Sequence, residues 1–304
     1  MTRIAFLIFY LSTFCAEGLL AQKDTFMLFY LGGQSNMDGF GYSKDLSASY
    51  QGDMKDCWIF TGNPAPDGDN SGGLGRWEVL RPGHGVGFSS DGKISRYSER
   101  FGIELSFASA LKRQYPSKKI ALIKYSRGGT SIDSLAAADF GCWDADFRGK
   151  GGINQYDHFL TTIRHANAER DINMDGKDDI IISCGILWMQ GESDATISEQ
   201  VARNYSAGLK KTIDLIRAAL HTDDLPVVIG RISDSRRNAA QKVWAYGELI
   251  QYAQEQFVKN DHRAAIVRDT EWYKYSDPWH YDSEGYLKLG EAFAREMVKL
   301  LKMK

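Results

Sequence analysis

The stretch TFMLFYLGGQSNMDGF, residues 25–40, contains an apolar run that stops at two glycines. The run from Phe26 to Leu31, bounded by glycines, is typical of a buried strand. Gly33 permits a tight turn, which leaves Ser35 at the carboxyl end of the strand. Sites in open α/β sheets are built at that end, so Ser35 is a candidate nucleophile. The alternative is a serine that only caps the start of a helix.

Strands and helices alternate along the rest of the chain. Apolar runs predict further strands at 57–60, 119–125, 180–189, 226–232 and 264–267. Apolar residues at helical spacing predict helices at 102–115, 157–169, 198–220, 239–258 and 283–301. This alternation indicates a parallel sheet that is covered by helices on both faces. The sequence shows no internal repeat and no linker, so we expect one domain over residues 22–304.

Charge and N-terminal composition indicate where the protein works. The formal net charge is −2, so no basic surface suggests a nucleic-acid partner. Residues 1–21 resemble a secretory signal, because Arg3 precedes an apolar run to Cys15 and small residues follow. We therefore expect cleavage within 18–21 and a secreted or periplasmic protein without a membrane span. The bulky residue before Cys15 argues against a lipid anchor.

Three cysteines follow the predicted signal, Cys57, Cys142 and Cys184. They allow three pairings, each with one thiol left over. Cys184 lies in the apolar run IIISCGILW and is expected to be a buried free thiol. By elimination, Cys57 with Cys142 is the disulfide to test first.

A region rich in Gly, Asp and Ser, residues 39–96, follows the candidate nucleophile. Its segment GNPAPDGDNSGGLG is a loop by its proline and glycine content. Loops of this length in compact domains are usually functional or disordered. The region is therefore a candidate wall of a substrate cleft, and a variable surface excursion is the alternative.

The segment DINMDGKDD, residues 171–179, has oxygen ligands at alternate positions. This is the spacing at the beginning of a calcium loop, and Gly176 permits the sharp turn. The segment departs from the EF-hand, because Ile182 stands where the bidentate Glu would be, and resembles shorter calcium-binding repeat loops. We predict a structural calcium ion, with an ordinary polar turn as the alternative. The candidate ligands are the side chains of Asp171, Asn173, Asp175 and Asp179 and the carbonyl of Lys177.

Polar residues also follow two later strands and precede the last helix. Asp277 and His280 are three residues apart, so the carboxylate can reach Nδ1 of the imidazole and leave Nε2 to face Ser35. A serine esterase needs such a base and orienting acid, together with donors for the oxyanion. Each motif alone also fits a turn, a polar loop or a helix cap. The candidate oxyanion donors are the backbone amides of Ser35 and of Gly128 or Gly129, and the side-chain amide of Gln190.

The motifs GGQSNM, YSRGGTSI, WMQGESD and DPWHYDSEG together resemble the successive blocks of the SGNH (GDSL-like) hydrolases. More narrowly, they resemble the carbohydrate acetylesterases of family 6, which are related to sialate O-acetylesterases. The blocks span residues 29–290. The resemblance implies a flavodoxin-like three-layer α/β/α fold with a central parallel sheet, and hydrolysis of O-acetyl groups on sugars.

The resemblance also assigns roles to residues. It implies that Ser35 is the nucleophile, His280 the base and Asp277 its partner, with the oxyanion donors named above. Glu192 either holds the active-site loops together or assists His280, and we favour the structural role. The supporting residues are Gln34, Asn36 and Glu192.

The sequence thus predicts a secreted serine esterase that removes acetyl groups from a polysaccharide through an acetyl-enzyme. Acetylated xylan is the preferred substrate, and no cofactor is expected for the chemistry. Within the same class the alternative is a sialate O-acetylesterase. Outside it, the alternatives are a catalytically inactive carbohydrate-binding relative and an enzyme that transfers the acetyl group to a sugar hydroxyl.

Overall fold

The computed structural model describes residues 23–149, 152–236 and 241–303. The predicted signal at 1–21 lies outside the described residues. Within them, no helix has the length and apolar character needed to cross a bilayer.

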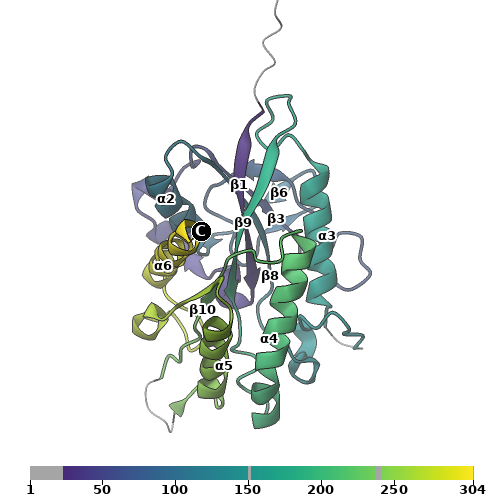
Figure 1. The fold of residues 1–304 in the computed structure, drawn as a ribbon, viewed down its shortest axis with the longest axis vertical. Helices are drawn as coiled ribbons and strands as arrows, with labels where there is room; N and C mark the ends of the chain where they lie inside the picture. The colour runs from purple at the N-terminus through teal and green to yellow at the C-terminus, as the bar shows by residue number, and fades with distance from the viewer. Residues whose placement is uncertain (1–22, 150–151, 237–240, 304) are drawn as a thin grey trace, which may run out of the picture.

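One seven-stranded sheet draws strands from both halves of the chain, with β1 at its centre (Figure 1). The strand order is β11-β10-β9-β1-β8-β3-β4, and every neighbouring pair is parallel except β3 and β4. The strands are β1 (Thr25–Gly33), β3 (Cys57–Thr61), β4 (Trp77–Val79), β8 (Lys119–Ser126), β9 (Ile180–Met189), β10 (Val227–Gly230) and β11 (Ala264–Val267). Two short antiparallel pairs lie outside this sheet, β2 (Gly41–Tyr42) with β7 (Arg100–Phe101), and β5 (Ser89–Ser90) with β6 (Ser95–Arg96).

Helices cover both faces of the sheet, which confirms the predicted three-layer α/β/α architecture. Helices α2 and α6 pack together on one face, whereas α3 and α4 lie on the other with α5 beside α4 (Figure 1). The helices are α1 (Ser35–Asp38), α2 (Glu104–Gln114), α3 (Gln155–Ala168), α4 (Glu199–Ala219), α5 (Gly247–Asn260) and α6 (Ser283–Lys302).

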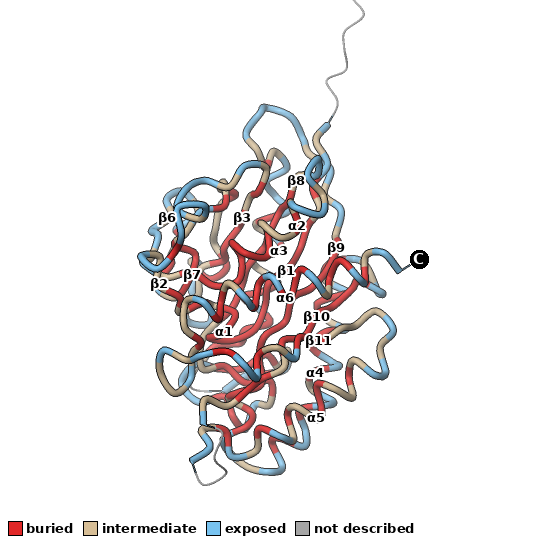
Figure 2. The backbone as a smooth tube through the Cα atoms, turned by 90° about the vertical axis from the view of Figure 1, so that its left-hand side faces the viewer, coloured by how far each residue is buried: buried red, intermediate tan, exposed pale blue. Residues whose placement is uncertain are grey.

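The central strands form the core. Figure 2 shows continuous burial along β1, where the run Leu28, Phe29, Tyr30 and Leu31 has no side chain more than 3% exposed. Strands in the middle of a parallel sheet are covered on both faces. This is why residues 26–31 of β1 are continuously apolar rather than alternating between apolar and polar residues.

The register of the sheet brings three strand ends to one level. Gly33 at the end of β1 is opposite Ser126 of β8 and Met189 of β9. The residues that follow these three strands therefore meet at the same edge of the sheet, as expected for a site in an open α/β fold.

The main differences from the expectations above are at one late helix and at one edge of the sheet. The helix expected from residue 239 begins at Gly247, because the carboxylate of Asp234 accepts hydrogen bonds from the backbone amides of Val243 and Trp244 and holds that segment as a loop. Residues 239 and 240 lie outside the described residues. Strand β4 has no counterpart among the predicted strands, because three residues inside a glycine-rich region give too short a pattern.

The disulfide that the sequence suggested for testing, Cys57 with Cys142, is not formed. Cys57, Cys142 and Cys184 are all free and buried, which confirms the expectation for Cys184. Cys57 lies in β3 within the main core, whereas Cys142 belongs to a separate apolar cluster. Burial raises the pKa of the Cys57 and Cys142 thiols to about 12, so both are protonated at neutral pH.

Candidate active site

Ser35 is the first residue of α1, directly after the central strand. The turn requires glycine, since Gly33 has φ of 143° and a Cβ there would lie 1.9 Å from the carbonyl oxygen of Met189. The backbone amide of Gln34 donates to that carbonyl at 2.9 Å. Ser35 is thereby held at the floor of a cavity with 7% of its surface exposed.

His280 and Asp277 form the predicted pair. Nδ1 of His280 lies 2.7 Å from Oδ2 of Asp277, and Oδ1 of Asp277 accepts the backbone amides of Trp279 and His280 at 2.8 Å. Burial acts to raise the pKa of Asp277, but the hydrogen bonds from His280 and Trp279 outweigh it and lower that pKa. The ionised carboxylate holds a proton on Nδ1 and leaves Nε2 to accept one.

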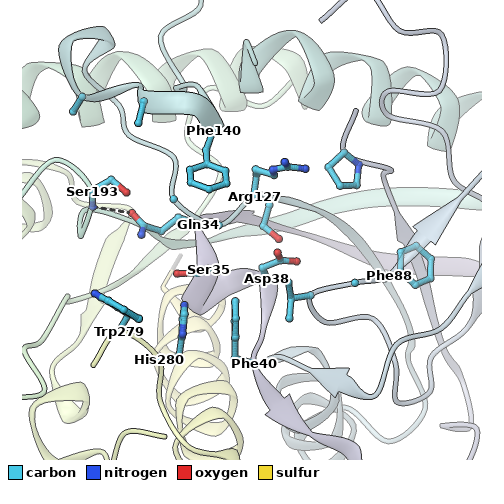
Figure 3. Close-up of a pocket in the computed structure, with 18 of the residues that line it drawn as sticks. Gln34, Ser35, Asp38, Phe40, Phe88, Arg127, Phe140, Ser193, Trp279 and His280 are labelled. Atoms are coloured by element: carbon cyan, nitrogen blue, oxygen red, sulfur yellow. Dashed lines mark hydrogen bonds between the residues drawn. The ribbon is translucent and has the colours of Figure 1, made fainter. Parts of the chain in front are cut away.

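Ser35 and His280 line the same cavity, and Figure 3 shows one edge of the imidazole directed toward the serine hydroxyl. The described residues include no direct hydrogen bond between the two side chains. Such contacts are often long in a free enzyme and tighten when substrate binds. The arrangement therefore fits a nucleophile and its base.

The Gly128-Gly129 turn approaches the nucleophile closely. A Cβ at Gly128 would lie 3.3 Å from Cβ of Ser35, and Gly129 has φ of 75°, which favours glycine. Neither backbone amide has a protein acceptor among the described residues. Both amides are therefore available to a ligand beside Ser35.

Gln190 does not have the predicted position. Its Nε2 donates to Asp194 at 2.7 Å and lies within reach of the Thr130 carbonyl and of Gln34 Oε1. Gln190 is fully buried and does not line the cavity. With both N–H groups engaged, the predicted direct donation to an oxyanion is wrong in this geometry.

Gln34 presents its amide to the cavity instead. Its Oε1 accepts from Gln190 Nε2 and from the backbone amides of Gly191 and Ser193, each at 3.3 Å. These three donors fix the oxygen of the amide away from the cavity, as Figure 3 shows for Ser193. The Nε2 group of Gln34 is left as a donor next to Ser35.

Asn36 connects the nucleophile turn to the histidine loop. Its Nδ2 donates to Glu192 at 2.8 Å and to the Trp279 carbonyl at 3.1 Å, and its Oδ1 accepts from the Tyr286 hydroxyl at 2.8 Å. Burial raises the pKa of Glu192 to about 7. These contacts agree with the structural role expected for Glu192.

Asp194 is a buried residue of the site that sequence reasoning missed. Its carboxylate accepts the backbone amides of Ile132 and Asp133 and the Gln190 amide, which ties the loop after β8 to the loop after β9. Burial raises the pKa of Asp194 to about 6. The available signal is its place in the motif WMQGESD, which by itself assigns Asp194 no role.

The cavity has a volume of about 890 Å³, and aromatic side chains form part of its wall. Thr61, Pro64, His84 and Phe88 all come from the region 39–96, which confirms its prediction as a cleft wall. The other aromatic lining residues are Phe40, Phe140, Trp244 and Trp279.

Acidic side chains of the loop 171–179 accept hydrogen bonds from backbone amides of the same loop. Asp171 and Asp175 accept backbone amides within the loop, and Asp179 accepts the amide of Ile172. No group of three or more His, Cys, Asp or Glu side chains suited to a metal occurs in the described part of the chain. Calcium binding by this loop therefore stays a prediction.

Solved structures resemble the chain at low sequence identity. A protein from Arabidopsis thaliana has a TM-score of 0.61 and 19% identity, covering 91% of this chain and 99% of its own. A carbohydrate acetylesterase from Xanthomonas citri has a TM-score of 0.57 and 15% identity, covering 91% of this chain and 57% of its own. NanS also has a TM-score of 0.57, with 13% identity, covering 93% of this chain and 99% of its own. These likenesses support the fold.

No match was found among the curated proteins. A family model described as "Carbohydrate esterase, sialic acid-specific acetylesterase" matches residues 25–299, which include β1, the nucleophile turn and the Asp277–His280 pair. The chain therefore belongs to this family of carbohydrate esterases.

Proposed function

We propose that the protein is a serine esterase that removes O-acetyl groups from acetylated xylan through an acetyl-enzyme. The observation that carries the proposal is the meeting of Ser35 and the hydrogen-bonded His280–Asp277 pair in one cavity. The family supports acetyl removal from carbohydrate, and the catalytic roles are our inference from the geometry.

Each step follows from the position of a group. Nε2 of His280 takes the proton of Ser35 as the hydroxyl oxygen attacks the acetyl carbonyl. The free amides of Gly128 and Gly129 and the Gln34 side chain are placed to stabilise the oxyanion. His280 then gives its proton to the departing sugar oxygen. Water, activated by the same histidine, releases acetate from Ser35.

Aromatic surface at the cavity supports a polymeric substrate. Trp279 and Phe140 line the cavity and retain 50% and 46% of their surface exposed. Exposed aromatic faces provide apolar surface on which the C–H faces of sugar rings can pack. This observation favours a glycan chain that extends beyond the acetylated residue.

Sialate O-acetyl removal is the second candidate. Arg127 lines the cavity, and a guanidinium can bind the carboxylate of a sugar acid. The experiment is to measure acetate release from acetylated xylan and from O-acetylated sialic acid, with wild type and Ser35→Ala. Loss of activity by a factor of order 10³ in the folded variant supports the assignment. Activity of Ser35→Ala comparable to that of wild type would refute the assignment of Ser35 as the nucleophile.

We also propose export, on the pattern of residues 1–21. N-terminal sequencing of the protein recovered from the producing cells tests it. A mature N-terminus just after residues 18–21 is expected, and an intact N-terminus would contradict export by cleavage.

A further inference from the structure

Two oppositely charged side chains lie in the cavity beside Ser35. Asp38 is the last residue of α1, which follows β1, and Arg127 directly follows β8, the strand paired with β1. Figure 3 shows them on the Phe88 side of the nucleophile, away from Trp279 and Ser193. Their position places them next to whatever carries the acetyl group.

Within the part of the chain that the structure describes, neither the Asp38 carboxylate nor the Arg127 guanidinium makes a hydrogen bond or an ion pair. Nearby Lys124 is already engaged, because its Nζ donates to Glu104 at 3.0 Å and to the carbonyls of Asp38 and His84 at 2.7 Å. The free carboxylate and guanidinium are therefore available to a ligand.

The ionised side chains of Asp38 and Arg127, which line the cavity, carry opposite charges that sum to zero. Burial raises the pKa of Asp38 to about 6 against the attraction of Lys124 and Arg127, so the carboxylate is mostly ionised at neutral pH. Burial lowers the pKa of His84 to about 3, so that lining histidine is neutral. One negative and one positive side chain remain beside the catalytic pair. Such a wall suits a neutral ligand that offers both donors and acceptors.

We propose that Asp38 and Arg127 bind neighbouring hydroxyl groups of a neutral sugar and thereby select neutral acetylated sugars over sugar acids. A sugar hydroxyl can donate to the Asp38 carboxylate, and a neighbouring hydroxyl oxygen can accept from the Arg127 guanidinium. A sugar acid would satisfy Arg127 but place its own carboxylate near that of Asp38. The inference rests on the proposed function. It names neighbouring hydroxyl groups of a neutral sugar as the substrate feature that the site recognises.

The test compares three acetyl esters: acetylated xylooligosaccharide, O-acetylated sialic acid and 4-nitrophenyl acetate. The readout is kcat/KM for each sugar ester divided by kcat/KM for the nitrophenyl ester, which has no sugar hydroxyls. Asp38→Asn and Arg127→Gln should each lower the xylooligosaccharide ratio by roughly 10- to 100-fold, as expected for hydrogen bonds to charged groups. Asp38→Asn should raise the sialic acid ratio, because it removes the repelling charge.

Asp223→Asn and Arg96→Gln are matched controls at exposed positions outside the cavity. Both should leave the two ratios unchanged. Thermal melts confirm folding, and Asp38→Ser replaces Asp38→Asn if the latter unfolds. Unchanged ratios in folded Asp38 and Arg127 variants would overturn this inference alone. A wild-type preference for sialic acid that only Arg127→Gln removes would also overturn it. A wild type that hydrolyses no sugar ester would overturn the proposed function as well.

Discussion

The phenyl ring of Phe40 lies face-on against the imidazole of His280, with ring centroids 3.6 Å apart and planes 5° from parallel. Asp277 fixes one nitrogen of the imidazole, and Phe40 covers one of its faces. Together they restrict the ring to the orientation in which its other nitrogen faces the cavity. We therefore expect Phe40 to position His280, a role that the motif comparison did not identify.

Phe40→Leu should lower kcat by roughly ten-fold, because the histidine loses the wall that holds its plane and aromatic pairs contribute about 0.5–1.5 kcal/mol. For a small acetyl ester, Phe40→Leu should change kcat more than it changes KM. Steady-state kinetics with 4-nitrophenyl acetate measures it. Phe257→Leu, in α5 of the core, is the matched control for lost packing. Equal effects of the two substitutions would argue against positioning.

Ser35→Ala and His280→Ala should each reduce activity by a factor of order 10³ or more, and the double variant should be no worse than either. Members of one catalytic unit are not additive, because the second residue has no step left to assist. Asp277→Asn should reduce activity by a smaller factor. Kinetics of all four proteins, with circular dichroism as the folding control, tests the unit. Losses that multiply would mean that Ser35 and His280 act independently.

Glu192→Gln should flatten the fall of stability between about pH 4 and pH 7. The folded-state pKa of Glu192 is raised from its ordinary value to about 7 by burial. Its contribution is therefore fully present below the unfolded pKa and is lost as pH rises through about 7, on the order of 1–3 kcal/mol. Glutamine keeps an acceptor for Asn36 and removes the titration.

Urea denaturation of wild type and Glu192→Gln at several pH values measures this difference. Asp38 and Asp194 also have raised pKa values, so the variant should retain part of the slope. If the free energy of unfolding depends on pH in the same way for both proteins, Glu192 does not titrate in this range.

Calcium binding by residues 171–179 would raise the melting temperature by mass action, and a chelator would lower it. Asp175→Asn should remove the difference, since it deletes one charged ligand. Thermal melts with calcium and with chelator, together with elemental analysis, provide the measurement. Identical melting temperatures and no bound calcium would leave a turn held by its own backbone contacts.

The architecture could be predicted because each central strand contains a run of mainly apolar residues. Residues 180–189 are the clearest case, and β9 has those bounds. The pairing of Asp277 with His280 was also predictable, since three residues of separation fix their reach. Local pattern is sufficient where structure depends on neighbours in sequence.

Contacts between distant segments could not be predicted. The position of Gln190 depends on the Thr130 carbonyl and on Gln34, which lie 60 and 156 positions away in sequence. The motif of Gln190 alone suggested a direct catalytic role. The Phe40 stack joins residues at opposite ends of the chain. The cysteine pairing failed for the same reason, because elimination carries no information about distance.

The contacts of Asn36 have a consequence for the order in which activity develops. Asn36 and Glu192 are 156 positions apart in sequence, and Asn36 and Tyr286 are 250 apart. Contacts of such separation form late, after the entropy of closing long loops has been overcome. During synthesis Ser35, Gly128 and Gly129 emerge well before His280. Ester hydrolysis should therefore begin only when the C-terminal helix docks, so that recovered activity during refolding reports the last assembly step rather than formation of the sheet.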